Sequence, residues 1–585
     1  MINRTMLAML MWCGVGIATA HAEVKTFCNP INIDYGVREI KGAWARHGAD
    51  PVIVLYKDQY WLFSTWDVPG YRVSDDLIHW KYVPFVAGPE LVGKTYTAAA
   101  VAQVGDWLYY TEFGKTTHLV AIWRTQEPET GKWEKVTDVP PYADPCLFVD
   151  PPSGRAYMTS GLEKPIHGVE LDRETMKEVA GTDTQLMPAY VLGTPIVNGW
   201  EVCTWDNSET SPGMRSTKTF NPCREGSWMT YYGGKYYLQY ASPGTTVPGY
   251  SDGLLISDKP LGPFVYSDYS PISRKDSGFI TSAGHSCLFQ DRYGNWWRAV
   301  TMLIGVHERM ERRIGLFPAG FDADGIPYTR TEMDVPVVLP EGKRDKDYVN
   351  WGILSDGKEV TVSSELEDHP AKLASDENVR TWWSAKTGNA GEWLQMDLGK
   401  EYDVRALQVN LAEQDYHPTE GKDVHQFVVK ASADGKAWEV VLDESHSEVA
   451  TPDDYVQLAK TMRARYVRVE NVFMPGGGKF AVSDLRVFGM GDGAKPQAVA
   501  QVNAERDAKD RRKVVIHWSP SDGATGYLVR YGITPDKWYQ HSRVRGGDVK
   551  ELTLYSLNSE PPYYFRVDAI NENGVSEGAG VAKTP

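Results

Sequence analysis

Three acidic side chains and one histidine recur at equivalent positions of a sequence repeat. Asp50, Asp144, Glu225 and His285 each lie ten to twelve residues before a short aromatic strand, and Thr97 holds this position in the remaining repeat. Polar residues held in phase with a structural repeat are expected to meet at one place. Three carboxylates brought together cannot all ionise freely, because like-charge repulsion and desolvation raise at least one pKa. The pattern therefore predicts a proton donor beside a proton acceptor.

Such a donor and acceptor are what glycoside hydrolysis requires. The alternative is structural, since the pairs Asp50-Pro51 and Asp144-Pro145 are each of a kind that often opens a turn. The ordered occurrence of both pairs together with Glu225 favours the catalytic interpretation. No cofactor is required for this chemistry.

The aromatic strands indicate the elements that position these residues. Their first residues are 47, 49, 80 and 60 residues apart, and about fifty residues fit one four-stranded propeller blade. The long interval has room for an insertion around 193–222. Five blades are predicted, and the alternative is a set of unrelated hairpins in a sandwich. The strands are Tyr60–Phe63, Trp107–Tyr110, Ala156–Thr159, Tyr236–Gln239 and Trp296–Ala299.

Length and composition agree with a large all-β protein. The chain has 585 residues, too many for one hydrophobic core, and 12% of them are aromatic. Its net charge is −16, and we find no concentrated basic surface of the kind that nucleic acid requires. Nucleic acid is therefore not expected as a partner.

The first 22 residues have the pattern of a secretory signal peptide, with an apolar run followed by Ala20-His21-Ala22. This run is too short to span a membrane, so we expect a secreted or periplasmic protein without a membrane span. Five cysteines remain after residue 22, which is no disulfide framework, although Cys203 and Cys223 could pair.

Two further modules are expected after the propeller. The predicted boundaries are 23–345 for the propeller, 350–490 for a β-sandwich, and 498–585 for a second sandwich. The segments Trp382–Ser384 and Trp393–Gly399 resemble the discoidin domain, also called coagulation factor 5/8 type C. The strands Val514–Trp518, Gly526–Gly532 and Tyr563–Ala569 resemble a fibronectin type III domain. The predicted fold class is all-β: a five-bladed β-propeller followed by two β-sandwich domains.

The propeller region also resembles a known family. The segments Ala49–Ile53, Asp144–Phe148 and Glu225–Met229 are similar to the three catalytic motifs of glycoside hydrolase family 43. The resemblance covers about residues 28 to 340 and includes all three acids in the family's order. It implies an exported inverting exo-glycosidase that acts on the side chains of a polysaccharide, with α-L-arabinofuranosidase or β-xylosidase as the favoured activity.

The resemblance also implies roles for individual residues. Asp50 would be the general base, Glu225 the general acid, and Asp144 the group that holds the acid's pKa and orientation. The base and acid carboxyls of an inverting enzyme are roughly 6.5 to 9.5 Å apart. His285 would lie on the channel axis beside a water cluster or a calcium ion. The residues expected to contact sugar are Trp44, Trp66, Thr97, Trp228 and Arg313.

Several alternatives remain open at this point. Thr97 stands where many family members have a Trp-Ala-Pro segment, so the sugar is not determined, and a galactose or anhydro-galactose substrate is an alternative. A non-catalytic carbohydrate-binding protein is another. The discoidin domain has three candidate roles: binding sugar, holding a structural calcium ion, or packing against the propeller.

Overall fold

The computed structural model describes residues 24–40, 43–65, 69–88, 97–113, 120–202, 221–418 and 423–585. Within these ranges the regular elements are β-strands and four short 3₁₀ helices, with no α-helix. The all-β prediction is confirmed. The signal-peptide residues, Trp66 and Cys203 lie outside the described residues. No helix in the described part of the chain is long and apolar enough to cross a membrane.

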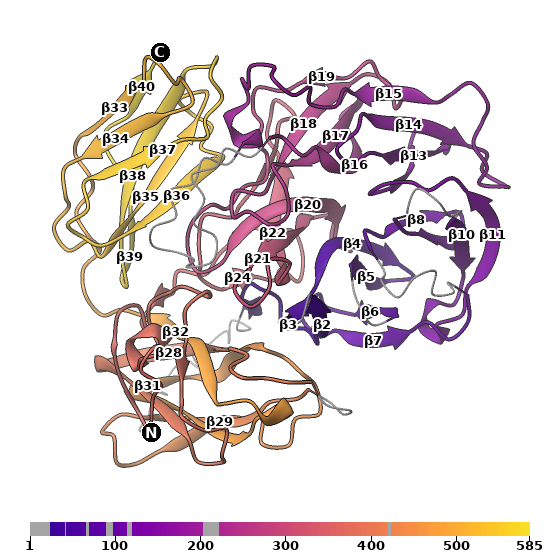
Figure 1. Cartoon of the computed structure of the whole chain (residues 1–585). Helices are drawn as coiled ribbons and strands as arrows, with labels where there is room; N and C mark the ends of the chain where they lie inside the picture. The colour runs from indigo at the N-terminus through magenta and orange to yellow at the C-terminus, as the bar shows by residue number, and fades with distance from the viewer. Residues whose placement is uncertain are drawn as a thin grey trace, which may run out of the picture.

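Five four-stranded sheets follow one another along the chain and form a propeller (Figure 1). All their strand pairs are antiparallel. Blade I comprises β4 (Ala49–Tyr56), β5 (Gln59–Thr65), β6 (Gly70–Ser74) and β7 (Lys81–Pro84). Blade II comprises β8 (Ala100–Val104), β9 (Trp107–Thr111), β10 (Val120–Thr125) and β11 (Glu134–Val139). Blade III comprises β12 (Cys146–Val149), β13 (Ala156–Ser160), β14 (Ile166–Leu171) and β15 (Thr184–Met187). Blade IV comprises β16 (Glu225–Tyr232), β17 (Lys235–Ser242), β18 (Ser251–Ser257) and β19 (Val265–Tyr266). Blade V comprises β20 (Thr281–Gln290), β21 (Trp296–Leu303), β22 (Arg312–Phe321) and β23 (Pro327–Thr329).

The predicted aromatic strands are the second strands of the five blades, β5, β9, β13, β17 and β21. Their alternating side chains pack into apolar layers between neighbouring blades. Trp61, for example, is buried between blades I and II, and Trp297 is buried between blades V and I. Large aromatic side chains thus fill the wedge-shaped spaces between the blades, which explains their repetition in the sequence.

Short pairings outside the blades hold the ends of the propeller together. Strand β1 (Thr26–Phe27) pairs with β24 (Val337–Val338), so the start of the described chain meets the segment that follows blade V. A hairpin of β2 (Gly36–Ile40) and β3 (Ala43–His47) precedes blade I. Its second strand ends close to the catalytic candidates.

The second module is a sandwich built on one eight-stranded sheet with a single large core. Trp383 is fully buried in that core and meets Phe480 edge to face. The strands are β25 (Gly352–Ile353), β26 (Glu359–Val362), β27 (Trp383–Ser384), β28 (Trp393–Leu411), β29 (Gln426–Ser432), β30 (Glu439–Asp443), β31 (Asp453–Phe473) and β32 (Ala481–Met490).

The third module packs two antiparallel sheets around Trp518, Tyr527 and Tyr563. One sheet contains β33 (Val502–Arg506), β34 (Val514–Trp518) and β37 (Glu551–Leu554). The other contains β36 (Gln540–Arg545), β35 (Gly526–Gly532), β38 (Tyr563–Asn571), β39 (Gly574–Ser576) and β40 (Ala582–Thr584).

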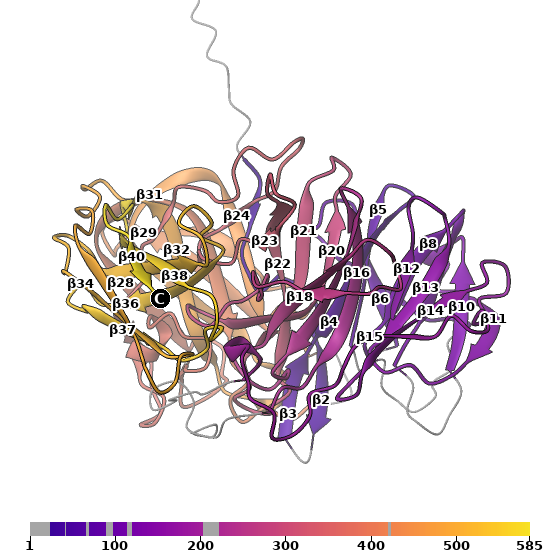
Figure 2. The same ribbon diagram turned by 90° about the horizontal axis from the view of Figure 1, so that it is seen from above.

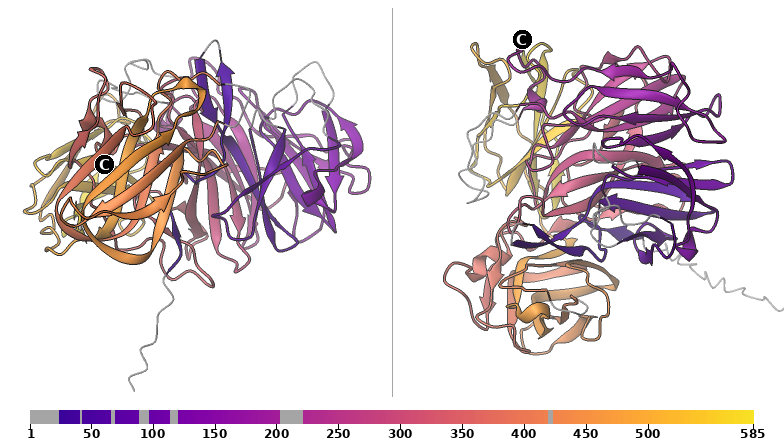
Figure 3. Two further views of the ribbon diagram at one scale, coloured as in Figure 1. Left: turned by 90° about the horizontal axis from the view of Figure 1, so that it is seen from below. Right: turned by 45° about the vertical axis from the view of Figure 1, so that its right-hand side comes forward.

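Both sandwich modules pack against the same side of the propeller, away from blades II and III (Figures 2 and 3). Val379 of the second module is buried in the apolar core of blade V, beside Phe279 and Phe317. Lys537 of the third module forms an ion pair of 2.6 Å with Asp322. The three modules therefore share buried contacts rather than being joined only by linkers.

Candidate active site

A repeated backbone conformation marks the inner edge of the five blades. Asp50, Ala98, Asp144, Gly226 and His285 all have a positive φ, between 43° and 58°. Bulges occur in the strand pairing at this point in blades I, IV and V. A positive φ costs a non-glycine residue about 1 to 3 kcal/mol, so its repetition in four such residues indicates a functional demand. The bulges re-aim the side chains toward a common place.

The carboxylate of Asp50 is held in an ionised state by several neighbours. Burial opposes ionisation, but Arg312 and His285 outweigh it and lower the pKa of Asp50 to about 2. Arg312 Nη1 lies 3.5 Å and His285 Nδ1 3.2 Å from Asp50 Oδ1. Thr65 donates a hydrogen bond to the other oxygen, and Thr301 accepts one from the Asp50 backbone N–H. Asp50 is therefore a buried carboxylate that stays charged near neutral pH.

The side chain of Glu225 has the opposite tendency. Burial raises its pKa, the hydroxyl of Tyr250 lowers it, and the net shift is upward. Tyr250 donates a 2.6 Å hydrogen bond to Oε1, and the Cys223 thiol lies 3.4 Å from Oε2. Burial also raises the pKa of the Cys223 thiol, so the thiol remains protonated. Glu225 is thus placed to carry a proton.

A second carboxylate anchors the chain just before Glu225. Arg224 forms two hydrogen bonds of 2.8 and 3.0 Å with Glu201, which is buried. Tyr240 donates a 2.8 Å hydrogen bond to the same carboxylate. This network fixes the backbone from which the Glu225 side chain projects.

Asp144 lies in the same charged cluster. Burial raises its pKa to about 7, with a further contribution from the negative charges of Glu225 and Asp50, while His285 opposes the rise. The backbone N–H of Gly226 hydrogen-bonds to its carboxylate. The structure therefore brings together the three acids that the repeat predicted.

His285 lies in the same charged cluster as these acids. Burial lowers its pKa, but Asp50, Asp144 and Glu225 outweigh burial and raise it above the usual value. Its backbone N–H donates a 2.9 Å hydrogen bond to Asp252. In the described part of the chain, no group of three or more His, Cys, Asp or Glu side chains is placed to hold a metal ion. The calcium ion or water cluster expected beside His285 stays a prediction.

The structure corrects the role expected for Arg313. Its Nε lies 2.9 Å from Asp453 of the second module, and its guanidinium lies 4.9 Å from the centre of the Tyr35 ring. The preceding residue, Arg312, contacts Asp50 instead. Neighbouring residues of a strand point to opposite faces, so a shift of one residue separates the two roles.

The other expected sugar contacts have different surroundings. Trp228 packs against the apolar layers of several blades, and its buried indole N–H lacks a hydrogen-bond partner among the described residues. This position favours packing over the expected stacking on sugar. Half-buried Trp44 lies on β3, on the strand face of Arg46 rather than His47. Thr97 is partly exposed and precedes Ala98, whose N–H donates to Thr65. Roles for Trp44 and Thr97 stay predictions, and Trp66 lies outside the described residues.

Two other expectations concern cysteine pairing and loops of the second module. Cys223 carries a free thiol, and its suggested partner Cys203 is not among the described residues. In the second module, the loop residue Tyr416 is buried against Gly476. This contact lies within the second module, so it does not decide among the three roles left open for the module.

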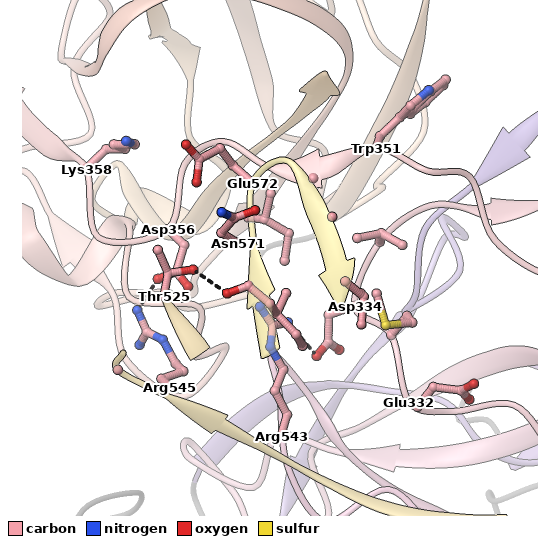
Figure 4. A pocket seen from close by; sticks show the side chains of 18 residues that line it. Glu332, Asp334, Trp351, Asp356, Lys358, Thr525, Arg543, Arg545, Asn571 and Glu572 are labelled. Atoms are coloured by element: carbon pink, nitrogen blue, oxygen red, sulfur yellow. Dashed lines mark hydrogen bonds and ion pairs between the residues drawn. The ribbon is translucent and has the colours of Figure 1, made fainter. Parts of the chain in front are cut away.

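A cavity of about 490 Å³ lies where the three modules meet, and it does not contain the three acids (Figure 4). Its charged side chains largely pair with one another. Arg543 lies 3.1 Å from Asp334, and Arg545 pairs with Asp356. The cavity therefore lies at a junction between modules, and it is not the site of the predicted chemistry.

Comparison with known families agrees with the geometry. Residues 44–327 match the family described as glycosyl hydrolases family 43, and residues 359–481 match the F5/8 type C domain. The chain therefore carries a family 43 glycosyl hydrolase domain followed by an F5/8 type C domain, as the sequence motifs predicted. It is a glycoside hydrolase of an inverting family that acts on O-glycosyl bonds. No family match covers the third module, so its fibronectin type III character stays a prediction.

Matches among solved structures include the following three proteins. One is a thermostable family-43 glycoside hydrolase, with 18% identity, a TM-score of 0.42, and coverage of 55% of this chain and 100% of the other. Another is the xylan β-1,4-xylosidase from Bacillus halodurans C-125, with 15% identity, a TM-score of 0.39, and coverage of 79% and 99%. A third is an exo-1,5-α-L-arabinanase from a bovine ruminal metagenomic library, with 19% identity, a TM-score of 0.36, and coverage of 50% and 100%. No curated protein matches the chain.

Proposed function

We propose that this protein is an exported, inverting exo-glycosidase that removes arabinofuranosyl or xylosyl units from polysaccharide side chains. The proposal is carried by two buried carboxyls of one charged cluster whose pKa values shift in opposite directions. Asp50 is driven toward the charged form, and Glu225 toward the protonated form. These tendencies favour a charged base and a protonated acid at the same pH.

The reaction follows from these two states. Asp50 takes a proton from a water molecule as the water oxygen attacks the anomeric carbon. Glu225 gives its proton to the glycosidic oxygen as the bond from that oxygen to the anomeric carbon breaks. Water enters opposite the leaving group, so the configuration inverts. Asp50 ends protonated and Glu225 ends charged, and exchange with solvent restores both.

Asp144 and His285 adjust the charge of the cluster. Asp144 binds the Gly226 backbone N–H and so orients the segment that carries Glu225. A protonated His285 partly neutralises the surrounding carboxylates and stabilises the ionised form of Asp50. We assign both as positioning residues rather than proton donors or acceptors in the reaction.

The substrate and the location are the finer parts of the proposal. The resemblance to family 43 described above supports the pentose substrates and the exo action. Export follows from the apolar N-terminal segment and the small residues at Ala20 and Ala22. A galactosidase remains the second candidate, because Thr97 departs from the usual second-blade motif.

The test compares hydrolysis of aryl arabinofuranosides, xylosides and galactosides by wild type, Asp50→Asn and Glu225→Gln. Loss of a general acid or base lowers kcat by about 10² to 10⁴. Glu225→Gln should retain more activity on aryl groups that leave readily, because these need little protonation. Asp50→Asn should lose activity on all of them, and NMR of the wild-type product should show inversion.

The control variant is Asp258→Asn, because Asp258 is a 77% exposed carboxylate that pairs with Lys235 at an outer turn of blade IV. It should keep wild-type rates. Equal rates for all four proteins would remove Asp50 and Glu225 from the mechanism. A product with retained configuration would show that Asp50 does not act through water.

A further inference from the structure

Two strands of the propeller each carry one residue toward the active site and a neighbouring residue toward the F5/8 type C domain. On β3, His47 contacts Arg312, whereas Arg46 contacts Glu413. On β22, Arg312 contacts Asp50, whereas Arg313 contacts Asp453. The same short segments of backbone therefore connect the active site with the second domain.

The contacts with the F5/8 type C domain are short and buried. Arg46 Nε lies 2.5 Å from Glu413, and these side chains are 1% and 6% exposed. Arg313 Nε lies 2.9 Å from Asp453, with exposures of 3% and 2%. Arg313 also donates a 2.9 Å hydrogen bond to the backbone oxygen of Arg46, so the two ion pairs are linked.

The face of the same strands that points to the active site is also tightly connected. Arg312 Nη1 donates a 2.7 Å hydrogen bond to Thr245 and lies 3.5 Å from Asp50. His47 Nδ1 lies 2.8 Å from the backbone oxygen of Met310, in the loop that leads into β22. Any shift of β3 or β22 would therefore move the cation that faces Asp50.

We propose that the F5/8 type C domain positions the active site, with Asp453 and Glu413 acting as positioning residues for hydrolysis through Arg312. The inference rests on the proposed role of Asp50 as the base. It assigns the domain a part in the reaction besides any binding of glycan.

The physical reason is the cost of an unpaired buried charge. When one partner of a buried ion pair is removed, the other charge is left in a medium of low polarity, and the structure relaxes around it. The Arg313 guanidinium would then move toward another hydrogen-bond acceptor, and β22 would move with it. A displacement of about 1 Å at a catalytic group can lower a rate by about a hundredfold.

The experiment measures kcat and KM for Asp453→Asn, Glu413→Gln and Arg312→Met. We expect Asp453→Asn to lower kcat about tenfold while KM changes less than about twofold. In the double variant with Arg312→Met, Asp453→Asn should cause no further loss of kcat, because its effect passes through Arg312. The control is Asp403→Asn in the same domain, since Asp403 pairs with Arg463 at the exposed surface.

The proposal would be overturned if the loss of kcat in the double variant equalled the product of the two single losses. It would also be overturned if kcat were unchanged in both Asp453→Asn and Glu413→Gln. If one of these variants fails to fold, the other carries the test. If wild type hydrolyses none of the glycosides, the proposed function fails and a crystal structure of Asp453→Asn decides this inference separately. An Arg312 to Asp50 distance still near 3.5 Å would reject it, and a distance beyond about 4 Å would support it.

Discussion

The hydroxyl of Tyr250 donates a 2.6 Å hydrogen bond to Oε1 of Glu225, although 25 residues separate them in the chain. Tyr250 is fully buried and lies just before β18, the strand beyond the partner of β16. This contact holds the proposed acid in one orientation and favours its charged form. It therefore sets both the geometry and the proton affinity of Glu225.

Replacing Tyr250 with phenylalanine should raise the pKa of Glu225, because the hydrogen bond stabilises the carboxylate. The acid would stay protonated to higher pH, so the basic limb of the kcat/KM profile should move upward. Loss of orientation should lower kcat by about tenfold to a hundredfold. Tyr237→Phe is the control, because its hydroxyl bonds to Gly325 away from the site. An unmoved basic limb would contradict this role for Tyr250.

Replacing Arg312 with methionine should favour the protonated form of Asp50, which cannot act as the base. Burial alone raises the pKa of Asp50, and Arg312 is the largest of the groups that oppose burial. Without this cation the pKa should rise, so the acidic limb of kcat/KM should move to higher pH. Activity measured between pH 3 and 8 checks the shift. Arg309→Met, at a side chain 64% exposed, should leave the profile in place.

Replacing Gly226 with alanine should disturb the site and the fold together. Its φ is 58°, and an added Cβ would lie 2.7 Å from the His285 ring. Strain of about 1 to 3 kcal/mol is expected from the backbone alone. Gly233 has a φ of 56° and open space around it, so Gly233→Ala measures the strain without the collision. Chemical denaturation should show a larger loss for Gly226→Ala, and equal losses would exclude the collision.

Low pH should weaken the contact between the third module and the propeller. Burial raises the pKa of Glu332, but Arg330 and Arg530 outweigh it and lower the pKa to about 2. A lowered carboxyl pKa stabilises the fold above its unfolded value and loses this effect as pH falls toward 2. We expect a loss of about 3 kcal/mol between pH 5 and pH 2. Glu332→Gln should flatten this part of the stability curve, whereas Glu577→Gln, at an exposed pair, should not.

The sequence predicted the propeller well because its evidence is periodic. The aromatic strands recur once per blade, and Asp50, Asp144 and Glu225 keep their distance from them. Position in a repeat translates directly into position around the axis. Periodicity therefore revealed the acids without any knowledge of long-range contacts.

Residues that support the acids were harder to predict. Thr65 reaches the site from β5 and Tyr250 from the segment before β18, and neither keeps the sequence phase that the acids share. Whether Arg312 or Arg313 contacts Asp50 depends on which face of β22 meets the active site. The sequence around these residues does not show which face this is. Such contacts depend on register and bulges that form only in the assembled sheet.

The closure of the propeller constrains how a nascent chain can fold. Thr26 bonds to Gln457 in the F5/8 type C domain, 431 residues later, and β1 pairs with β24. The first strand can therefore complete its contacts only after most of the chain has emerged from the ribosome. Contacts so distant in sequence slow folding and leave sheet edges exposed to aggregation. Shortened chains that end before Gln457 should for this reason depend on chaperones more than the whole protein does.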